Sequence, residues 1–264
     1  GQVRDATDPE QLWSLTSRYR LDVTPPTDNR PFFFNLLRLS RPWEILGYMG
    51  RPSGVVTGNL MATLALLAIL FVTLVFGAAI VYLPARFAPA GASLPRAVEL
   101  AYFVLIGLGF MFVEIAFLQR LSVYLGHPVY ALAVVLFSLI FFTGLGSWSS
   151  QRIRLTTPLR VAVYAMGLAT YLAGVAWLIP TITTATAGTG LFGRAAVSLA
   201  LLAPAGLLMG LAFPNGLRLA QRGDADPTPW LWGVNGAAGV LASALAVILS
   251  IAWGITTTML VGAF

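Results

Sequence analysis

The sequence has no cysteine and no lysine, and only one histidine among its 264 residues. Without cysteine, the chain cannot form disulfide bonds, use a thiolate nucleophile or bind a metal through sulfur. A single histidine cannot supply two haem ligands or the usual multi-histidine metal set. A Walker-type phosphate loop and a serine–histidine–aspartate set are also missing. We therefore expect no cofactor other than lipid, and no enzymatic activity of this chain by itself.

Charged residues are scarce as well. They make up 10% of the chain, against about 25% in a typical soluble domain, and 58% of the chain is hydrophobic. Most of the surface must therefore face something other than water. The 16 basic residues, all arginine, lie at the amino end and in short segments between apolar runs, as in membrane proteins. They do not gather with stacking aromatics as in a nucleic-acid-binding protein, so we expect membrane lipids and no nucleic acid as partners.

Six long apolar runs follow the first 57 residues, and each is close to the roughly 20 residues that a membrane-spanning helix needs. They predict an all-α integral membrane protein. Residues 1–57 would form a short extramembrane or interfacial segment, and residues 58–264 a six-helix transmembrane bundle. The predicted helices are 58–83, ended by Pro84; 97–125; 129–148, begun by His127-Pro128; 159–179, stopped by Pro180; 195–217; and 232–261.

Two predicted helices share a loose pattern, with GLGFMFVEIAFLQRL at 107–121 and MGLAFPNGLRLA at 209–220. A three-plus-three repeat, as in half of a major-facilitator bundle, would fit this pattern. Small residues crowd 233–246, which predicts that the sixth helix lies inside the bundle. Pro204 and Pro214 predict bends in the fifth helix, where the Asn215 side chain would cap or bond a freed carbonyl.

Glu114 lies near the middle of the second predicted helix. A carboxylate at mid-membrane costs roughly 2.5–3.5 kcal/mol on insertion scales, so Glu114 must face protein or water. One interpretation is an intramembrane polar site for a proton, a cation or a substrate, with Gln119 and Asn235 nearby. The other is a structural hydrogen bond from Glu114 to another helix, for which Asn235 and Ser243 are the candidates.

The segment VTPPTDNRPFFFNLLR, residues 23–38, precedes the first apolar run. Its three prolines exclude a regular helix, and Asp28 and Asn29 favour a turn. One interpretation is an interfacial anchor with aromatic rings at headgroup depth and arginines extended toward water. The other is a docking segment for a soluble domain. The candidate interfacial or docking residues are Arg30, Phe32, Phe33, Phe34, Arg120 and His127. Arg120 lies near the end of the second predicted helix, and His127 lies in the turn after it.

Three separated stretches carry a resemblance: residues 24–38, 106–139 and 229–247. They resemble the carboxy-terminal membrane region of bacterial spermidine-synthase-like membrane proteins, in which a major-facilitator-like part is fused to a soluble spermidine-synthase or methyltransferase-like domain. The resemblance implies a location in the bacterial cytoplasmic membrane. It also implies a membrane partner domain and not the catalytic half, since an S-adenosyl compound would bind only through the soluble domain, which is absent here.

These observations favour a non-catalytic membrane subunit or anchor domain that docks a partner protein or a larger membrane complex, or associates with itself. The alternative is a solute-binding or transport domain with Glu114 as its central polar group. The number of polar groups that converge on Glu114 distinguishes the two. A transport cavity should bring at least two partners from other helices to Glu114, whereas an anchor should leave Glu114 buried with one bond. The arginine distribution does not settle the membrane orientation.

Overall fold

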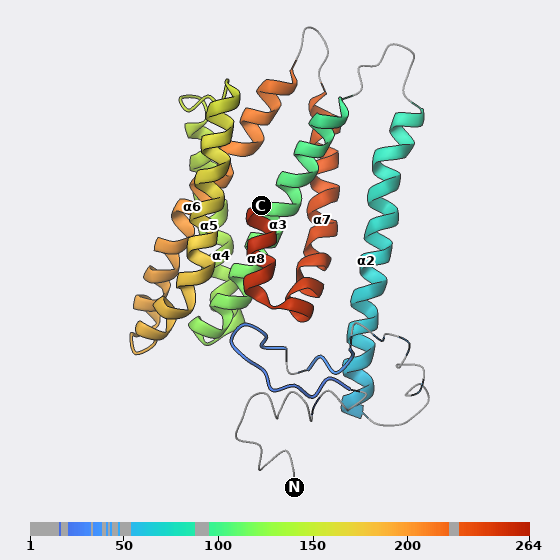
Figure 1. Cartoon of the computed structure of the whole chain (residues 1–264), viewed down its shortest axis with the longest axis vertical. Coiled ribbons are helices and arrows are strands. Elements are labelled where there is room, and N and C mark those ends of the chain that lie inside the picture. The colour runs from blue at the N-terminus through green and yellow to red at the C-terminus, as the bar shows by residue number, and fades with distance from the viewer. Residues whose placement is uncertain are drawn as a thin grey trace.

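The structure, a computed structural model, consists of helices that follow the apolar runs (Figure 1). It describes residues 16, 21–32, 34–38, 41, 43, 47, 54–87, 95–221 and 227–264. These residues contain seven helices and no β-strand: α2 (Gly54–Arg86), α3 (Ala97–Leu125), α4 (Pro128–Ser149), α5 (Pro158–Ala185), α6 (Leu191–Ala220), α7 (Thr228–Trp253) and α8 (Ile255–Ala263). The six helices from α2 to α7 are long and apolar enough to cross a membrane. The prediction of an all-α integral membrane protein is confirmed.

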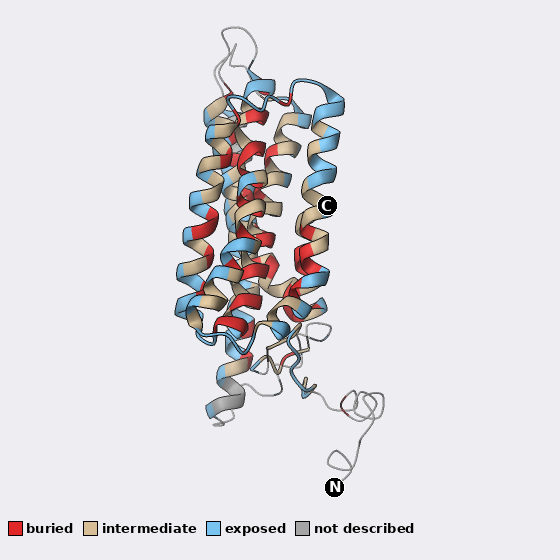
Figure 2. Cartoon of the chain, turned by 90° about the vertical axis from the view of Figure 1, so that its left-hand side faces the viewer, coloured by how far each residue is buried: buried red, intermediate tan, exposed pale blue. Residues whose placement is uncertain are grey.

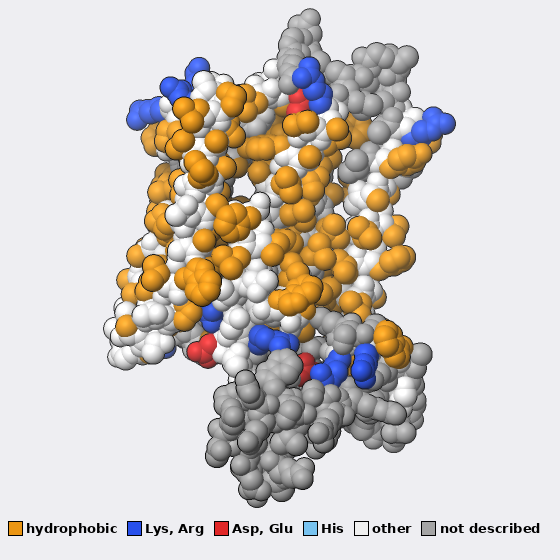
Figure 3. Space-filling model, in the orientation of Figure 1, with side chains coloured by type: hydrophobic (Ala, Val, Ile, Leu, Met, Phe, Trp, Pro, Cys, Tyr) orange, Lys and Arg blue, Asp and Glu red, His pale blue; other side chains and the backbone are white. Residues whose placement is uncertain are grey.

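α3 lies at the centre of the bundle and packs against α4, α6, α7 and α8. α5 covers α6 and α8, and α2 packs on α7 at the edge of the molecule (Figure 1). The main core cluster joins α3, α4, α5, α6 and α8, with Phe117, Val135, Leu172 and Leu202 among its fully buried side chains. Buried residues face inward and exposed residues face outward along the helices (Figure 2). Since the outward residues are largely apolar, this surface suits lipid (Figure 3).

The bundle has two polar ends. One end, here called the amino-terminal face, carries residues 21–38, the α3–α4 turn, the α5–α6 loop and the α7–α8 turn (Figure 1). The opposite face carries the α4–α5 loop and the ends of α2 and α6. Arginines lie at both ends of the bundle and leave the middle of the view almost free of basic side chains (Figure 3). This is the charge distribution that a membrane-spanning bundle requires.

α4 and α6 approach one another most closely at glycines. Gly206 and Gly210 have the G-x-x-x-G spacing, which places both on one face of α6. A Cβ at Gly206 would lie 2.8 Å from the Phe142 Cβ, and one at Gly210 would collide with the Thr143 carbonyl oxygen. On α4, Gly146 lies equally close to the Leu207 backbone. Small residues therefore let these two backbones touch, where lipid gives no hydrophobic force between helices.

Two predicted helix ends are wrong because proline does not stop the helix. α2 continues past Pro84 to Arg86, and α5 continues past Pro180 to Ala185. In α5, Thr183 Oγ1 donates to the Ile179 carbonyl at 2.8 Å and Thr184 Oγ1 to the Pro180 carbonyl at 2.8 Å. Proline removes one backbone donor, and hydroxyl groups of this kind bond the carbonyls around it, so transmembrane helices tolerate the ring.

The prediction of one continuous sixth helix, 232–261, is also wrong, because two helices occupy this region. The chain breaks at Gly254, whose φ of 93° lies in the region that favours glycine. α7 ends at Trp253, and α8 turns back to pack beside α3, α5 and α7. Apolar residues continue across the break, so hydrophobicity alone gives no sign of it.

The small residues of α7 are only partly interior. Ala242 and Ala246 are fully buried against Phe112 of α3. Gly233 and Gly236, however, face open space, because a Cβ added at either position would have no atom within 4 Å. The three-plus-three repeat stays a prediction: α3 packs on α7 as α6 packs on α4, but α2 packs on α7 without a matching α5–α4 contact among the main helix pairs.

We predict that Gly210→Ala destabilises the bundle by about 1–3 kcal/mol, because the new methyl group forces α4 and α6 apart. The matched control is Gly236→Ala, a helical glycine in open space, which should change stability by less than about 1 kcal/mol or stabilise. Thermal unfolding in detergent measures both. Equal effects of the two substitutions would contradict the close packing of α4 and α6.

Candidate functional site

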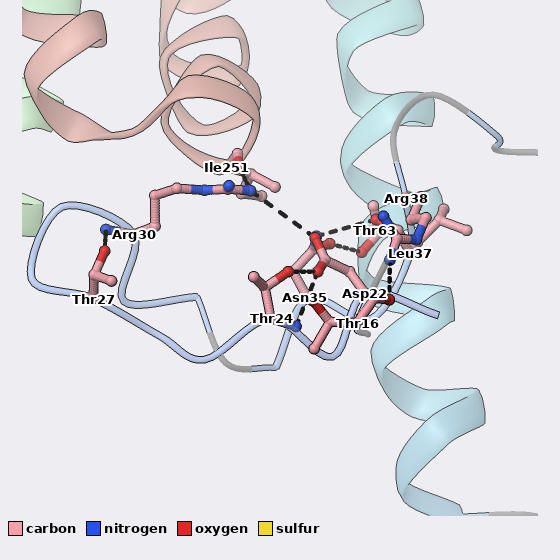
Figure 4. A network of polar contacts seen from close by, with 10 residues as sticks. All are labelled: Thr16, Asp22, Thr24, Thr27, Arg30, Asn35, Leu37, Arg38, Thr63 and Ile251. Carbon is pink, nitrogen blue, oxygen red and sulfur yellow. Dashed lines mark hydrogen bonds and ion pairs between the residues drawn. The ribbon is translucent and has the colours of Figure 1, made fainter. Parts of the chain in front are cut away.

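Residues 21–38 form a loop that runs across the amino-terminal face from α2 to the α7–α8 turn (Figure 4). Its two arms are joined by the Asp22 amide, which donates to the Leu36 carbonyl at 2.8 Å. At its tip, the Arg30 amide donates to the Thr27 carbonyl at 2.8 Å and the Thr27 amide to the Arg30 carbonyl at 3.2 Å. The prolines around this tip exclude helix, and Asp28 and Asn29 form the turn, as the sequence predicts.

Asn29 caps the start of α8. The Ile255 amide donates to the Asn29 carbonyl at 2.9 Å, and the Thr256 amide donates to Asn29 Oδ1 at 2.8 Å. The first amides of a helix have no partner within the helix, and asparagine is a favoured residue for accepting from them. Here the cap comes from a distant part of the chain. A Cβ at Gly254 would collide with the Asn29 side chain, so this close approach requires glycine.

Arg120 ties this cap to α3. Its guanidinium donates from Nη1 to the Asp28 carbonyl at 2.8 Å and from Nη2 to Thr256 Oγ1 at 3.0 Å. Thr256 Oγ1 in turn donates to Asn29 Oδ1 at 2.8 Å. Arg120 is only 7% exposed. The expectation of an interfacial arginine extended toward water is therefore wrong: Arg120 turns inward and holds the chain's own amino-terminal segment.

The rest of the loop is bound to α7 and α2 (Figure 4). Arg30 Nη2 donates to the Ile251 carbonyl at 2.8 Å, in the last turn of α7, where a cation also complements the helix dipole. Thr63 of α2 donates from Oγ1 to Asn35 Oδ1 at 2.8 Å. Asp22 lies 3.9 Å from the Arg30 guanidinium. Residues 21–38, together with the Arg120 and Thr256 side chains that hold this loop on the bundle, are called the seat below.

The phenylalanines predicted to be interfacial or docking residues lie in different environments. Phe32 packs against the main core cluster, and Phe34 is 60% exposed. Phe33 lies outside the described residues. His127 is exposed at the amino-terminal face and accepts from the Val129 amide through Nδ1 at 3.2 Å. It therefore caps α4, and Pro128 occupies the first helical position, as the sequence predicts.

The three residues predicted to form an intramembrane polar site do not come together. Asn235 donates from Nδ2 to the Phe103 carbonyl at 2.9 Å. Gln119 Oε1 is buried and accepts no hydrogen bond. Glu114 is half-buried on α3, and no described residue makes a hydrogen bond or an ion pair with its carboxyl group. Ser243 donates to the Val240 carbonyl of its own helix, so neither predicted partner is hydrogen-bonded to Glu114.

A second group of polar side chains fixes a loop on the opposite face, and the sequence analysis does not predict this group. Arg218 of α6 donates to the Ser150 carbonyl at 2.8 Å and to Ser150 Oγ at 2.9 Å. Asn215 Oδ1 accepts from the Leu155 amide at 3.0 Å, which fixes the α4–α5 loop. Asn215 Nδ2 also donates to the Leu211 carbonyl at 2.9 Å. The carbonyl that Pro214 frees is that of Gly210, four residues earlier, so the predicted bond to a freed carbonyl stays a prediction.

Two chemical possibilities find no support in the part of the chain that the structure describes. No group of three or more histidine, cysteine, aspartate or glutamate residues is placed to hold a metal ion. Residues 188–193, GTGLFG, have the G-x-G-x-x-G spacing of a dinucleotide-binding loop. They join α5 to α6, however, and this motif needs a preceding strand in a βαβ unit.

Comparisons with protein-family models, curated proteins and solved structures found no match to this chain. The resemblance to spermidine-synthase-like membrane proteins therefore stays a prediction. The structure shows an integral membrane bundle in which Arg120 of α3 and Thr256 of α8 bind the loop of residues 21–38.

We predict that Asn29→Ala lowers the free energy of unfolding by about 1–2 kcal/mol, because the Thr256 amide and hydroxyl lose their acceptor. Asn29→Asp is the matched variant, since it keeps an acceptor oxygen at the same place and should lose much less. Thermal unfolding in detergent and protease sensitivity of residues 21–38 report the change. Equal losses in the two variants would show that the cap does not hold the loop.

Proposed function

We propose that the chain is a non-catalytic membrane domain that holds a partner protein, or a larger membrane complex, at its amino-terminal face. The observation that carries this proposal is the chain of hydrogen bonds from the buried Arg120 through Thr256 to Asn29. These bonds fix an extramembrane loop to the helices of the bundle. A fixed loop suits a docking platform, because a rigid surface loses little entropy when a partner binds.

The surface of this face supports the proposal. Phe34, within the seat, is 60% exposed, and Trp43, which follows the seat in the chain, is 63% exposed. Exposed aromatic residues on a rigid surface are typical anchors of protein interfaces, since they bury a large area with few rotatable bonds. Because the resemblance is to bacterial membrane proteins, we place the domain in a bacterial cytoplasmic membrane, with lipids as further partners.

A second candidate function is binding or transport of a solute at Glu114. The favouring observation is that this half-buried carboxyl group has no hydrogen bond or ion pair with a described residue. It is therefore available to a cation or a proton. Against this candidate, Gln119 and Asn235 do not approach Glu114, so the gathering of polar groups that a transport cavity needs is missing among the described residues.

We predict that the native protein, purified in mild detergent, carries a stoichiometric partner protein. Phe34→Ser combined with Trp43→Ser should reduce the co-purified partner at least about tenfold, because the aromatic anchors are lost. Quantitative mass spectrometry measures the ratio. The control is Trp148→Ser, which removes a tryptophan of similar exposure, 65%, from the opposite face and should retain the partner.

Glu114→Gln separates the two candidates, since it removes the charge with little change of shape. The docking function predicts an unchanged partner ratio in this variant and no change in solute binding. A wild-type protein that purifies without a partner, and whose binding of a cation is lost in Glu114→Gln, would overturn the docking function in favour of the solute site.

A further inference from the structure

A cleft lies at the amino-terminal face between residues 21–38 and the end of α7. It has a volume of about 200 Å³ and is lined by Asp22, Thr24, Thr27, Arg30, Phe32 and Ile251, among others. Pockets for drug-sized molecules measure roughly 300–1,000 Å³, so this cleft suits a smaller group. Its lining combines one acid, one base, hydroxyl groups and an apolar side.

Asp22 and Arg30, the acid and the base of the cleft, do not form a hydrogen bond with each other. Asp22 Oδ2 is 3.9 Å from Arg30 Nη2, which is too far for a hydrogen bond. Asp22 Oδ1 accepts from the amide and the hydroxyl of Thr24, and Arg30 Nη2 donates to the Ile251 carbonyl. The remaining atoms, Asp22 Oδ2 and Arg30 Nη1 and Nε, make no hydrogen bond with the described residues. The cleft therefore offers one anionic acceptor and two cationic donors side by side.

The depth of the cleft in the membrane follows from its contacts. Ile251 belongs to the last turn of α7, one of the helices that could cross the membrane, and Arg30 bonds its carbonyl (Figure 4). On the other side, Asn35 is bonded to Thr63 in the first part of α2. The cleft therefore lies where the apolar spans end and the extramembrane loop begins. Lipid headgroups occupy this layer of a bilayer.

We propose that this cleft binds a phosphoethanolamine group, presented by an ethanolamine phospholipid of the surrounding membrane. The phosphate accepts hydrogen bonds from Nη1 and Nε of Arg30, and the primary ammonium donates to Asp22 Oδ2. A two-carbon chain joins phosphate and ammonium, which suits two opposite charges 3.9 Å apart. A choline headgroup has no N–H to donate, and a glycerol headgroup has no cation to meet Asp22.

The test is native mass spectrometry of the full chain in detergent with equal amounts of phosphatidylethanolamine, phosphatidylcholine and phosphatidylglycerol. Bound phosphatidylethanolamine should exceed each of the others about tenfold, the usual effect of one charge-assisted hydrogen bond. Asp22→Asn should abolish this preference and leave the fold intact, since asparagine keeps the oxygen that accepts from Thr24. Arg154→Gln, an exposed arginine on the opposite face, is the control and should retain the preference.

Two results would overturn the site: equal binding of the three lipids by the wild-type protein, or an unchanged preference in Asp22→Asn. Soluble phosphoethanolamine tests the source of the group. We expect it to leave the lipid bound at micromolar concentrations, and displacement there would assign the cleft to a free metabolite in place of a lipid. The two proposals fail separately, because Asp22→Asn changes a charge of the cleft and leaves the exposed side chains of Phe34 and Trp43 unchanged.

Discussion

The buried guanidinium of Arg120 is the interaction on which the amino-terminal face depends. A charged group in an apolar bundle is costly unless hydrogen bonds compensate it. Arg120 finds its acceptors on the loop at Asp28 and on α8 at Thr256. The loop and the α7–α8 turn are therefore positioned by the same side chain. Removal of either acceptor would leave a buried donor unsatisfied, which couples the extramembrane segment to the packing of the helices.

Other arginines of the molecule also donate hydrogen bonds to backbone carbonyls of a distant element. Arg194 donates to the Tyr124 carbonyl at the end of α3, Arg218 to the Ser150 carbonyl after α4, and Arg30 to the Ile251 carbonyl at the end of α7. The last carbonyls of a helix have no partner within it, and a nearby cation also complements the helix dipole. With 10 acidic residues for 16 arginines, ion pairs cannot satisfy every arginine. These three arginines bond carbonyls at helix ends, and Arg30 also lies 3.9 Å from Asp22. Each cap joins two elements that are distant in sequence.

The local sequence pattern predicts most of the transmembrane helices but few of the contacts that form the seat. Length and apolarity place the start of each span within about four residues, because the bilayer imposes both, whereas the ends at Pro84 and Pro180 and the unbroken sixth span are wrong. His127-Pro128 also predicts its helix start, since the cap and the helix are adjacent. The break at Gly254 and the continuation past Pro180 depend instead on contacts with Asn29 and with threonine hydroxyls. Asn29 and Thr256 meet across 227 residues, a distance at which no local pattern operates. Glu114 is the most conspicuous polar residue of the sequence, yet the polar network forms around Arg120.

A double-mutant cycle of Arg120→Met and Asn29→Ala tests most directly whether one hydrogen-bond network fixes the loop to the bundle, because the two side chains are linked only through Thr256 and the loop backbone. The free energies of unfolding are measured in detergent for the wild type, both single variants and the double variant. A single network predicts a coupling energy of about 1 kcal/mol, since either single variant already disrupts the shared chain of hydrogen bonds. Strictly additive effects would show that Arg120 and Asn29 act independently, and would contradict a single network.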